Sequence, residues 1–276
     1  MRFTTISWNL FHGRDFPPDP ALFTWRSRLL RVTERNDTHV QVNRDLTAEF
    51  AAWLAAAEWD VALLQETPPR YAEPLARACR AEPHRVLTSR NSLAPLRTFA
   101  ARLNPDLIAS GEGGSNLTLV RPDGPLGAIV ERHGVAIHEG RPERRAMAMT
   151  RTASGLCVAN LHATNDFPPL AVADVLLAAR AAVEFAGDGP LVFGGDLNLR
   201  PARDPELFAE LAERYGLATP VTGPDRIDHL LARGLEVVSA PAPWPPERRE
   251  VELDGRALRL SDHAPVEAMF KTADAR

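Results

Sequence analysis

The feature that most constrains the fold is a repeated pairing of short apolar segments with polar residues at their ends. Residues 61–64 are all apolar, and Gln65 and Glu66 follow them directly. Residues 191–193 are also apolar, and two glycines and then Asp196 follow. Strands of an open α/β layer deliver side chains to one rim in this way. The sequence therefore predicts an α/β fold whose site lies along strand ends.

Hydrophobic periodicity predicts the remaining elements. A helix is expected over residues 46–59, because apolar side chains recur there at helical spacing. Further helices are expected over residues 70–81, 169–186 and 204–215. The expected strands lie near residues 2–9, 61–64, 84–88, 115–120, 127–137, 145–152, 156–161, 191–193, 227–232 and 264–270. Residues 14–44 begin with a proline-rich stretch, which predicts an irregular start, and then become arginine-rich.

Composition sets limits on partners and location. The chain has 276 residues, and its 45% hydrophobic content is enough for a large core. A net charge of −4 argues against a strong overall attraction to a polyanion. No apolar stretch approaches the length of a membrane span, and the N-terminus lacks the apolar run of a signal peptide. We expect a cytoplasmic monomer with no membrane span, in which Cys79 and Cys157 are free thiols.

The strand-end residues supply the groups that metal-assisted phosphoester hydrolysis needs. A hard cation takes oxygen ligands from carboxylates and amides. An imidazole transfers a proton or donates to a phosphate oxygen. These groups occur together in six segments: Ser7-Trp8-Asn9-Leu10, Leu64-Gln65-Glu66, Asn160-Leu161-His162, Gly194-Gly195-Asp196-Leu197-Asn198, Ile227-Asp228-His229 and Ser261-Asp262-His263-Ala264-Pro265.

In their order along the chain, these segments resemble the motif set of the endonuclease/exonuclease/phosphatase superfamily. The resemblance extends from Asn9 to Pro265. It implies a four-layer α/β sandwich, with two mixed β-sheets packed face to face and helices outside. The whole chain, residues 1–276, is then one domain with an insertion at about residues 14–44. We expect this insertion to form a wall beside the metal site, because it begins directly after Asn9 and is too short for its own core.

The same resemblance implies a metal site. Glu66 is similar to the main Mg²⁺ ligand, with Asn9 nearby, and Asp262 contributes to the metal region. Mn²⁺ is expected to substitute for Mg²⁺. The sequence leaves open whether one metal ion or two take part.

The resemblance also implies catalytic roles. Asp196 is similar to the residue that orients or deprotonates the attacking water. Asn198 and His162 resemble phosphate-binding groups. His263 resembles the histidine that contacts phosphate or transfers a proton, and Asp228 its orienting carboxylate. We therefore expect Asp228 and His263 to be hydrogen-bonded.

Several alternatives stay open. The chain is expected to hydrolyse a phosphoester, which includes nucleic acids, nucleotides and phospholipid headgroups, as a diesterase or a monoesterase. A non-catalytic binding protein of the same fold is the second hypothesis. The Asn9–Gly13 segment is closer to the phosphatase and phosphodiesterase branches than to apurinic endonucleases. His12 is expected either to line the site or to stabilise a turn, and His229 to point to the opposite sheet face from Asp228.

Overall fold

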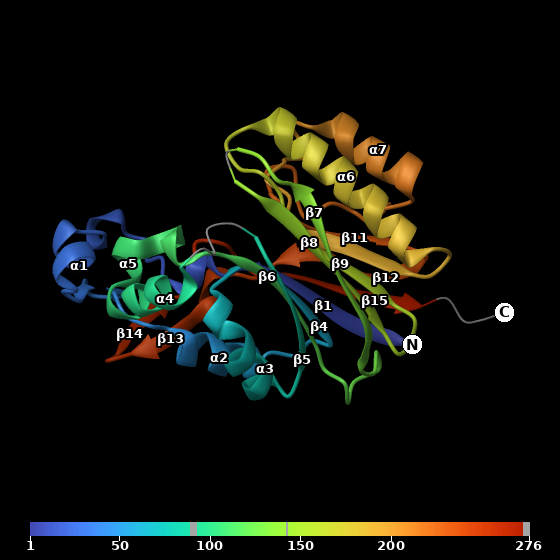
Figure 1. Cartoon of the computed structure of the whole chain (residues 1–276). Helices are drawn as coiled ribbons and strands as arrows, with labels where there is room; N and C mark the ends of the chain where they lie inside the picture. The colour runs from blue at the N-terminus through green and yellow to red at the C-terminus, as the bar shows by residue number, and fades with distance from the viewer. Residues whose placement is uncertain (89–92, 142, 273–276) are drawn as a thin grey trace.

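Two β-sheets form the centre of the protein in a computed structural model that describes residues 1–88, 93–141 and 143–272 (Figure 1). The first sheet has the strand order β12-β15-β1-β4-β6-β5 and the second β11-β10-β9-β8-β7. The strands of the first sheet are β1 (Arg2–Asn9), β4 (Val61–Thr67), β5 (Glu82–Leu87), β6 (Ser115–Val120), β12 (Leu235–Pro243) and β15 (Val266–Thr272). Those of the second are β7 (Ile129–His138), β8 (Arg145–Thr152), β9 (Cys157–His162), β10 (Leu191–Asp196) and β11 (Asp228–Arg233).

Three groups of buried side chains show how the layers stack. One group lies between the two sheets and includes Phe3, Leu63 and Val192. A second joins the outer face of the first sheet to α2 (Thr47–Ala56) and α3 (Ala72–Cys79). The third joins the second sheet to α6 (Pro168–Ala186) and α7 (Pro205–Tyr215), which lie side by side in Figure 1. The order helices, sheet, sheet, helices confirms the predicted four-layer sandwich.

Local sequence explains the helices that cover the sheets. α6 buries a stripe of alanines, whose small side chains let the helix approach the second sheet closely. α7 begins with Pro205 and ends before Gly216, which adopts a left-handed conformation at φ 68°. Proline suits the first turn of a helix and glycine its end, because the first lacks an N–H that would be unpaired and the second tolerates positive φ.

Two pairs of parallel strands determine where the polar strand ends meet. β1 runs parallel to β4, so Asn9 pairs with Gln65. β9 runs parallel to β10, so His162 pairs with Asp196. β11 runs antiparallel to β10, and its first residue, Asp228, pairs with Asp196. The ends of these strands therefore lie on one rim of the sandwich.

Residues 14–44 form small elements on one side of the sandwich. They are η2 (Pro20–Leu22), α1 (Trp25–Leu30), β2 (Glu34–Arg35) and β3 (Val40–Gln41). In Figure 1 they lie next to α4 (Ala94–Leu103), α5 (Pro105–Ile108) and the hairpin of β13 (Glu250–Leu253) and β14 (Arg256–Arg259). The remaining short 3₁₀ segments are η1 (Phe11–Gly13), η3 (Pro69–Tyr71), η4 (Ala109–Glu112) and η5 (Pro246–Arg249).

The structure extends the sequence-based prediction in two respects. The strand predicted over residues 61–64 continues to Thr67, so Glu66 lies within β4. The predicted strands and helices did not include β12, α4, α5 or the β13–β14 hairpin. β12 is an edge strand with two prolines and exposed residues, and it lacks the apolar pattern of the central strands. Among the described residues, no helix has both the length and the apolar character of a membrane span.

Candidate active site

The candidate site lies where β1, β4, β9, β10 and β11 meet on the rim, together with the segment before β15. Glycine is required at its base. A Cβ atom on Gly195 would lie 1.9 Å from the carbonyl oxygen of Leu161, and its φ is +130°. A Cβ atom on Gly194 would lie 2.3 Å from the carbonyl oxygen of His229. The two glycines let β10 pass close to both neighbouring strands and carry Asp196 to the rim.

Beneath the rim, buried amides connect the two sheets. Gln65 Nε2 donates to Asn160 Oδ1 at 2.8 Å, and Asn160 Nδ2 donates to the carbonyl of Leu117 at 3.1 Å. Both side chains are completely buried. Gln65 and Asn160 both belong to segments singled out in the sequence, and their role here is to hold β4 and β9 together below the reactive groups.

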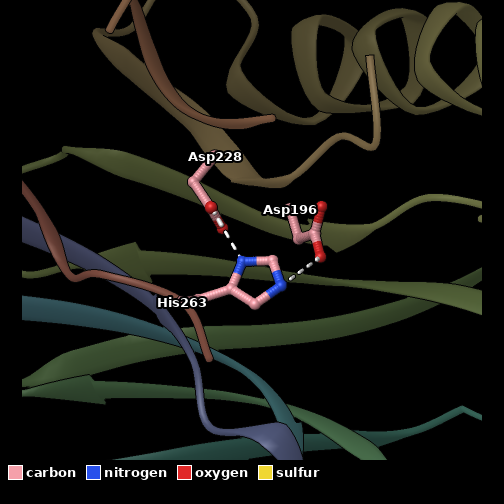
Figure 2. A group of neighbouring side chains, drawn as sticks. All are labelled: Asp196, Asp228 and His263. Carbon is pink, nitrogen blue, oxygen red and sulfur yellow. Dashed lines mark hydrogen bonds and ion pairs between the residues drawn. The ribbon is translucent and has the colours of Figure 1, made fainter. Parts of the chain in front are cut away.

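Asp228 and His263 form the predicted pair. His263 Nδ1 lies 2.8 Å from Asp228 Oδ2. Figure 2 shows this contact between the two side chains. Burial disfavours the charged imidazole, but the Asp228 carboxylate outweighs it and holds the pKa of His263 well above its usual value. The backbone of His263 is also held, because its N–H donates to Ser261 Oγ at 3.1 Å and its carbonyl accepts from Trp8 Nε1 at 2.9 Å. The Asp228 contact therefore orients the imidazole ring, and the two backbone contacts hold the main chain of His263 in place.

Asp196 lies at the centre of the site and is only 2% exposed. Its Oδ2 accepts from Asn9 Nδ2 at 3.0 Å, and the same oxygen is 3.6 Å from His162 Nε2 and 3.9 Å from His263 Nε2. Its Oδ1 accepts from the backbone N–H of Asn198 at 3.1 Å. Burial, followed by the charge of Asp228, raises the pKa of Asp196 to about 7. Such a carboxylate accepts a proton near neutral pH.

Glu66 lies on the other side of His162. Its two carboxylate oxygens are 3.1 Å from His12 Nε2 and 3.8 Å from His162 Nε2. Burial alone would raise the pKa of Glu66, but the two histidines and the Asn9 amide lower it to about 2. Glu66 is therefore ionised across the physiological range.

Asp262 is a second carboxylate that interacts with Glu66. Its Oδ1 is 3.9 Å from His263 Nε2. Burial raises the pKa of Asp262, and the charge of Glu66 raises it further. Two carboxylates whose charges repel each other in a buried site favour a bound cation, since a cation offsets both the burial and the repulsion. Asp196, Asp228 and His263 form another group whose ligand atoms could hold a metal ion, because they all lie within 4.8 Å of one another.

His162 is a neutral group at this site. Burial, followed by the positive charge of Arg145, lowers the pKa of His162 to about 3. A neutral imidazole offers one N–H donor, which suits contact with a phosphate oxygen. Asn198, on the other side of Asp196, donates its side-chain amide to the carbonyl of Ala163 at 3.0 Å. This hydrogen bond joins the segment that follows β9 to the segment that follows β10.

The backbone at the rim is unusual. Phe11, His12, Glu66, Asn198 and Ser261 are non-glycine residues with positive φ, between 46° and 61°. Such conformations cost free energy and persist where the surrounding structure holds them, often at functional sites. Five of them near one rim indicate that the backbone is shaped to place particular side chains.

All eight predicted residues enter one connected network. The distances above link Asn9, Glu66, His162, Asp196, Asn198, Asp228, Asp262 and His263.

The structure also decides the role of two other histidines. His12 lines the site beside Glu66. His229 is fully buried, with Nε2 3.0 Å from the carbonyl of Arg226, and packs edge-on against Phe208. His229 is therefore a buried structural histidine.

One cation was not assigned from the sequence. Arg14 belongs to the proline-rich stretch, and its carbonyl accepts from the N–H of Ser261 at 3.0 Å. Burial lowers the pKa of Arg14, while the charges of Asp106, Glu66 and Asp262 raise it. The carboxylates of Glu66 and Asp262 therefore interact electrostatically with the Arg14 guanidinium. Nothing in the sequence next to Arg14 signals this role.

Comparisons with solved structures place the fold among known proteins. An endonuclease/exonuclease/phosphatase family protein of Bacteroides thetaiotaomicron is 15% identical with a TM-score of 0.63, covering 99% of each chain. A mannosyl-6-phosphatase of the same organism is 16% identical with a TM-score of 0.62, covering 98% of this chain and 99% of the other. Truncated TDP2 of Caenorhabditis elegans is 14% identical with a TM-score of 0.55, covering 98% and 97%. At these identities the likeness concerns the fold.

A search of curated proteins found no match. The sequence model of the Endonuclease/Exonuclease/phosphatase family matches residues 6–263 of this chain. This range includes all eight residues of the network. The match covers nearly the whole chain and agrees with the strand order and the rim described above. The chain therefore belongs to the endonuclease/exonuclease/phosphatase family.

Proposed function

We propose that this protein hydrolyses phosphoester bonds and depends on a divalent cation, Mg²⁺ by preference, with Mn²⁺ as a substitute. Members of its family are hydrolases of phosphoester bonds. The observation that carries the proposal is the arrangement around Asp196. A buried carboxylate lies within 4 Å of two imidazoles, and one of these is held by a second carboxylate.

The residues divide the chemistry between them. Asp196, with its raised pKa, accepts a proton from the attacking water and orients it. His263 stays protonated beside Asp228 and donates from Nε2 to a phosphate oxygen or to the leaving group. His162 and Asn198 flank Asp196 and are assigned to contact the phosphate.

Glu66 and Asp262, with Asn9 between Glu66 and Asp196, are the residues that would hold the cation. When bound, Mg²⁺ polarises a phosphoryl oxygen and stabilises the charge that develops on it. The donor chemistry fits, because carboxylate and amide oxygens are the ligands that hard cations prefer. The alternative group of Asp196, Asp228 and His263 fits Mg²⁺ less well, because Asp228 Oδ2 and His263 Nδ1 already satisfy each other.

The test is a hydrolysis assay on purified protein with bis-p-nitrophenyl phosphate and p-nitrophenyl phosphate, in Mg²⁺, in Mn²⁺ and in EDTA. Asp196→Asn and His263→Gln are each expected to lower kcat/KM by roughly 10²–10⁴-fold. Glu184→Gln, an exposed substitution on α6, serves as the control and should change nothing. Absence of hydrolysis on both substrates and on a panel of nucleotides and phospholipids would favour the non-catalytic binding hypothesis instead. Comparing the two p-nitrophenyl esters also separates a diesterase from a monoesterase.

A further inference from the structure

Segment 14–44 borders a cavity that none of the assigned residues uses. The cavity has a volume of about 350 Å³, and its lining includes Phe11, Arg14, Phe16, Phe23, Arg28 and Asp106. Phe11 follows Asn9 by two residues, and its backbone N–H donates to Asn9 Oδ1 at 2.9 Å. The cavity therefore begins at the edge of the candidate active site.

Aromatic rings form one wall of this cavity. The Phe11 and Phe16 rings meet edge to face with centroids 5.7 Å apart, and the Phe16 and Phe23 centroids are 5.1 Å apart. Phe16 is 38% exposed and Phe23 43% exposed, although both are large apolar side chains. Adjacent exposed rings at the edge of a polar site are typical of binding surfaces rather than of a folding core.

Arg14 connects this aromatic wall to the carboxylates. Its guanidinium carbon lies 3.7 Å from the centroid of the Phe11 ring, and its Nε donates to the Phe11 carbonyl at 3.2 Å. The charges of Glu66 and Asp262 act on the same guanidinium. A molecule with its phosphate among the carboxylates and cation of the site would meet Arg14 first and the phenyl rings next.

Most polar atoms of the cavity are already engaged. Thr24 Oγ1 donates to Glu34 at 2.6 Å and accepts from the N–H of Ser27 at 3.0 Å. Asp106 Oδ2 accepts from Gln41 Nε2 at 2.8 Å. Asp15 is only 2% exposed and offers no accessible oxygen.

The existing hydrogen bonds and the aromatic wall determine which kind of ligand this cavity suits. A sugar ring carries hydroxyl groups around its rim, and only the guanidinium groups of Arg14 and Arg28 would be left to pair with them, because the phenyl rings offer no polar atom. An alkyl chain would remove water from the charges of Arg14, Arg28 and Asp106 without replacing their contacts, which is costly. A flat aromatic ring stacks on phenyl and guanidinium faces and leaves the edge of the guanidinium solvated.

We propose that this cavity is a substrate subsite that takes a planar aromatic ring carried by the phosphoester, either a nucleobase or an aryl group. The proposal rests on the proposed function, because it assigns the phosphate of the same molecule to the Asp196 site. Phe16 and Phe23 stack with the ring. Arg14 bridges the ring and the phosphate, and the exposed Arg28 is a further donor to polar atoms on the ring.

The test measures binding without turnover. In an Asp196→Asn background with Mg²⁺, isothermal titration compares adenosine 5′-monophosphate, phenyl phosphate, ribose 5-phosphate and methyl phosphate. Stacking of a base on an aromatic side chain contributes enough for the ring-bearing phosphates to bind roughly 5- to 150-fold more tightly than their ring-less counterparts. The double variant Phe16→Ala, Phe23→Ala should remove this preference and leave ribose 5-phosphate binding unchanged. Leu177→Ala, which removes another exposed apolar side chain, on α6, is the matched control.

The outcomes separate the two proposals. Equal binding of ring-bearing and ring-less phosphates, or a preference that survives in the double variant, overturns the subsite even if the wild-type protein hydrolyses phosphoesters. A ring preference that depends on Phe16 and Phe23 supports the subsite even if no phosphoester is hydrolysed, in which case only the proposed function fails. Tighter binding of adenosine 5′-monophosphate than of phenyl phosphate identifies a nucleobase as the ring, and equal binding indicates that any aryl group is accepted.

Discussion

Replacing Asp228 by asparagine tests the role assigned to the Asp228–His263 pair. The change keeps the shape of the side chain and removes its charge. In the structure the pair is joined at 2.8 Å, with the Asp228 and His263 side chains 12% and 16% exposed. Asparagine still hydrogen-bonds to Nδ1, but it no longer stabilises a protonated imidazole, and its amide group can select the wrong tautomer.

The size of the effect follows from the contact that is lost. A hydrogen bond to a charged group contributes about 1.5–3 kcal/mol, and each 1.36 kcal/mol corresponds to a tenfold change in rate. Asp228→Asn should therefore lower kcat/KM by about 10- to 150-fold. That loss is smaller than the roughly 10²–10⁴-fold expected for removing His263, because Asp228 acts through the imidazole.

A double-mutant cycle on bis-p-nitrophenyl phosphate in Mg²⁺ is the measurement. Once His263 is glutamine, the additional change Asp228→Asn should have little effect on kcat/KM. Asp225→Asn, an exposed aspartate in the loop before β11, is the control and should match wild type. Thermal unfolding curves of all variants show whether the fold is intact. If the two substitutions lower kcat/KM independently, so that their effects add, the pairing has no catalytic role and the reasoning is wrong.

Three further predictions concern the metal, the backbone and pH. EDTA should abolish hydrolysis and added Mg²⁺ should restore it; activity that survives exhaustive chelation would contradict the oxygen-ligand site. Gly195→Ala should lower the free energy of unfolding by at least about 4 kcal/mol, because the new Cβ atom would collide with the Leu161 carbonyl. Gly155→Ala should lower it by only about 1–2 kcal/mol, because Gly155 also has a positive φ, +84°, but has open space around it. Denaturant titration would show whether the two variants differ in this order. Burial lowers the pKa of His84 to about 4, so protonation favours unfolding, and its contribution to stability is lost as pH falls from about 6.5 to about 4. Between pH 7 and pH 4, wild type should lose about 3 kcal/mol more stability than His84→Gln, and parallel pH profiles would disprove this.

The local pattern of the chain was sufficient to predict most of the central elements. β4 and β10, inside the two sheets, begin with continuous apolar runs because both of their faces are buried, and such runs can be read without knowing the fold. Edge and peripheral elements could not be read in this way. β12 is exposed along much of its length and contains prolines. α5 contacts α1 of segment 14–44, and α4 contacts α5 and η4, so their apolar residues follow peripheral contacts and not those of the main core.

The reactive residues were predictable for a similar reason. Asn9, Glu66 and Asp196 come at or near the ends of recognisable strands, and the order of their motifs resembles one family. His12 and Arg14 were not assigned, because nothing in their immediate sequence distinguishes a residue that lines a site from one that stabilises a turn. Their position depends on how the backbone turns after β1, where Phe11 and His12 both adopt positive φ.

The sequence by itself determined the layers, the order of the strands' polar ends and the kinds of chemical group available at the rim. Only the tertiary structure decided which groups touch. Asn9 and Asp196 are hydrogen-bonded although 187 residues separate them, and Gln65 meets Asn160 across 95 residues. The aromatic cavity beside Arg14 likewise combines residues of segment 14–44 with Asp106. Periodicity is a property of neighbours along the chain, whereas these contacts depend on how two sheets and an irregular segment pack against one another.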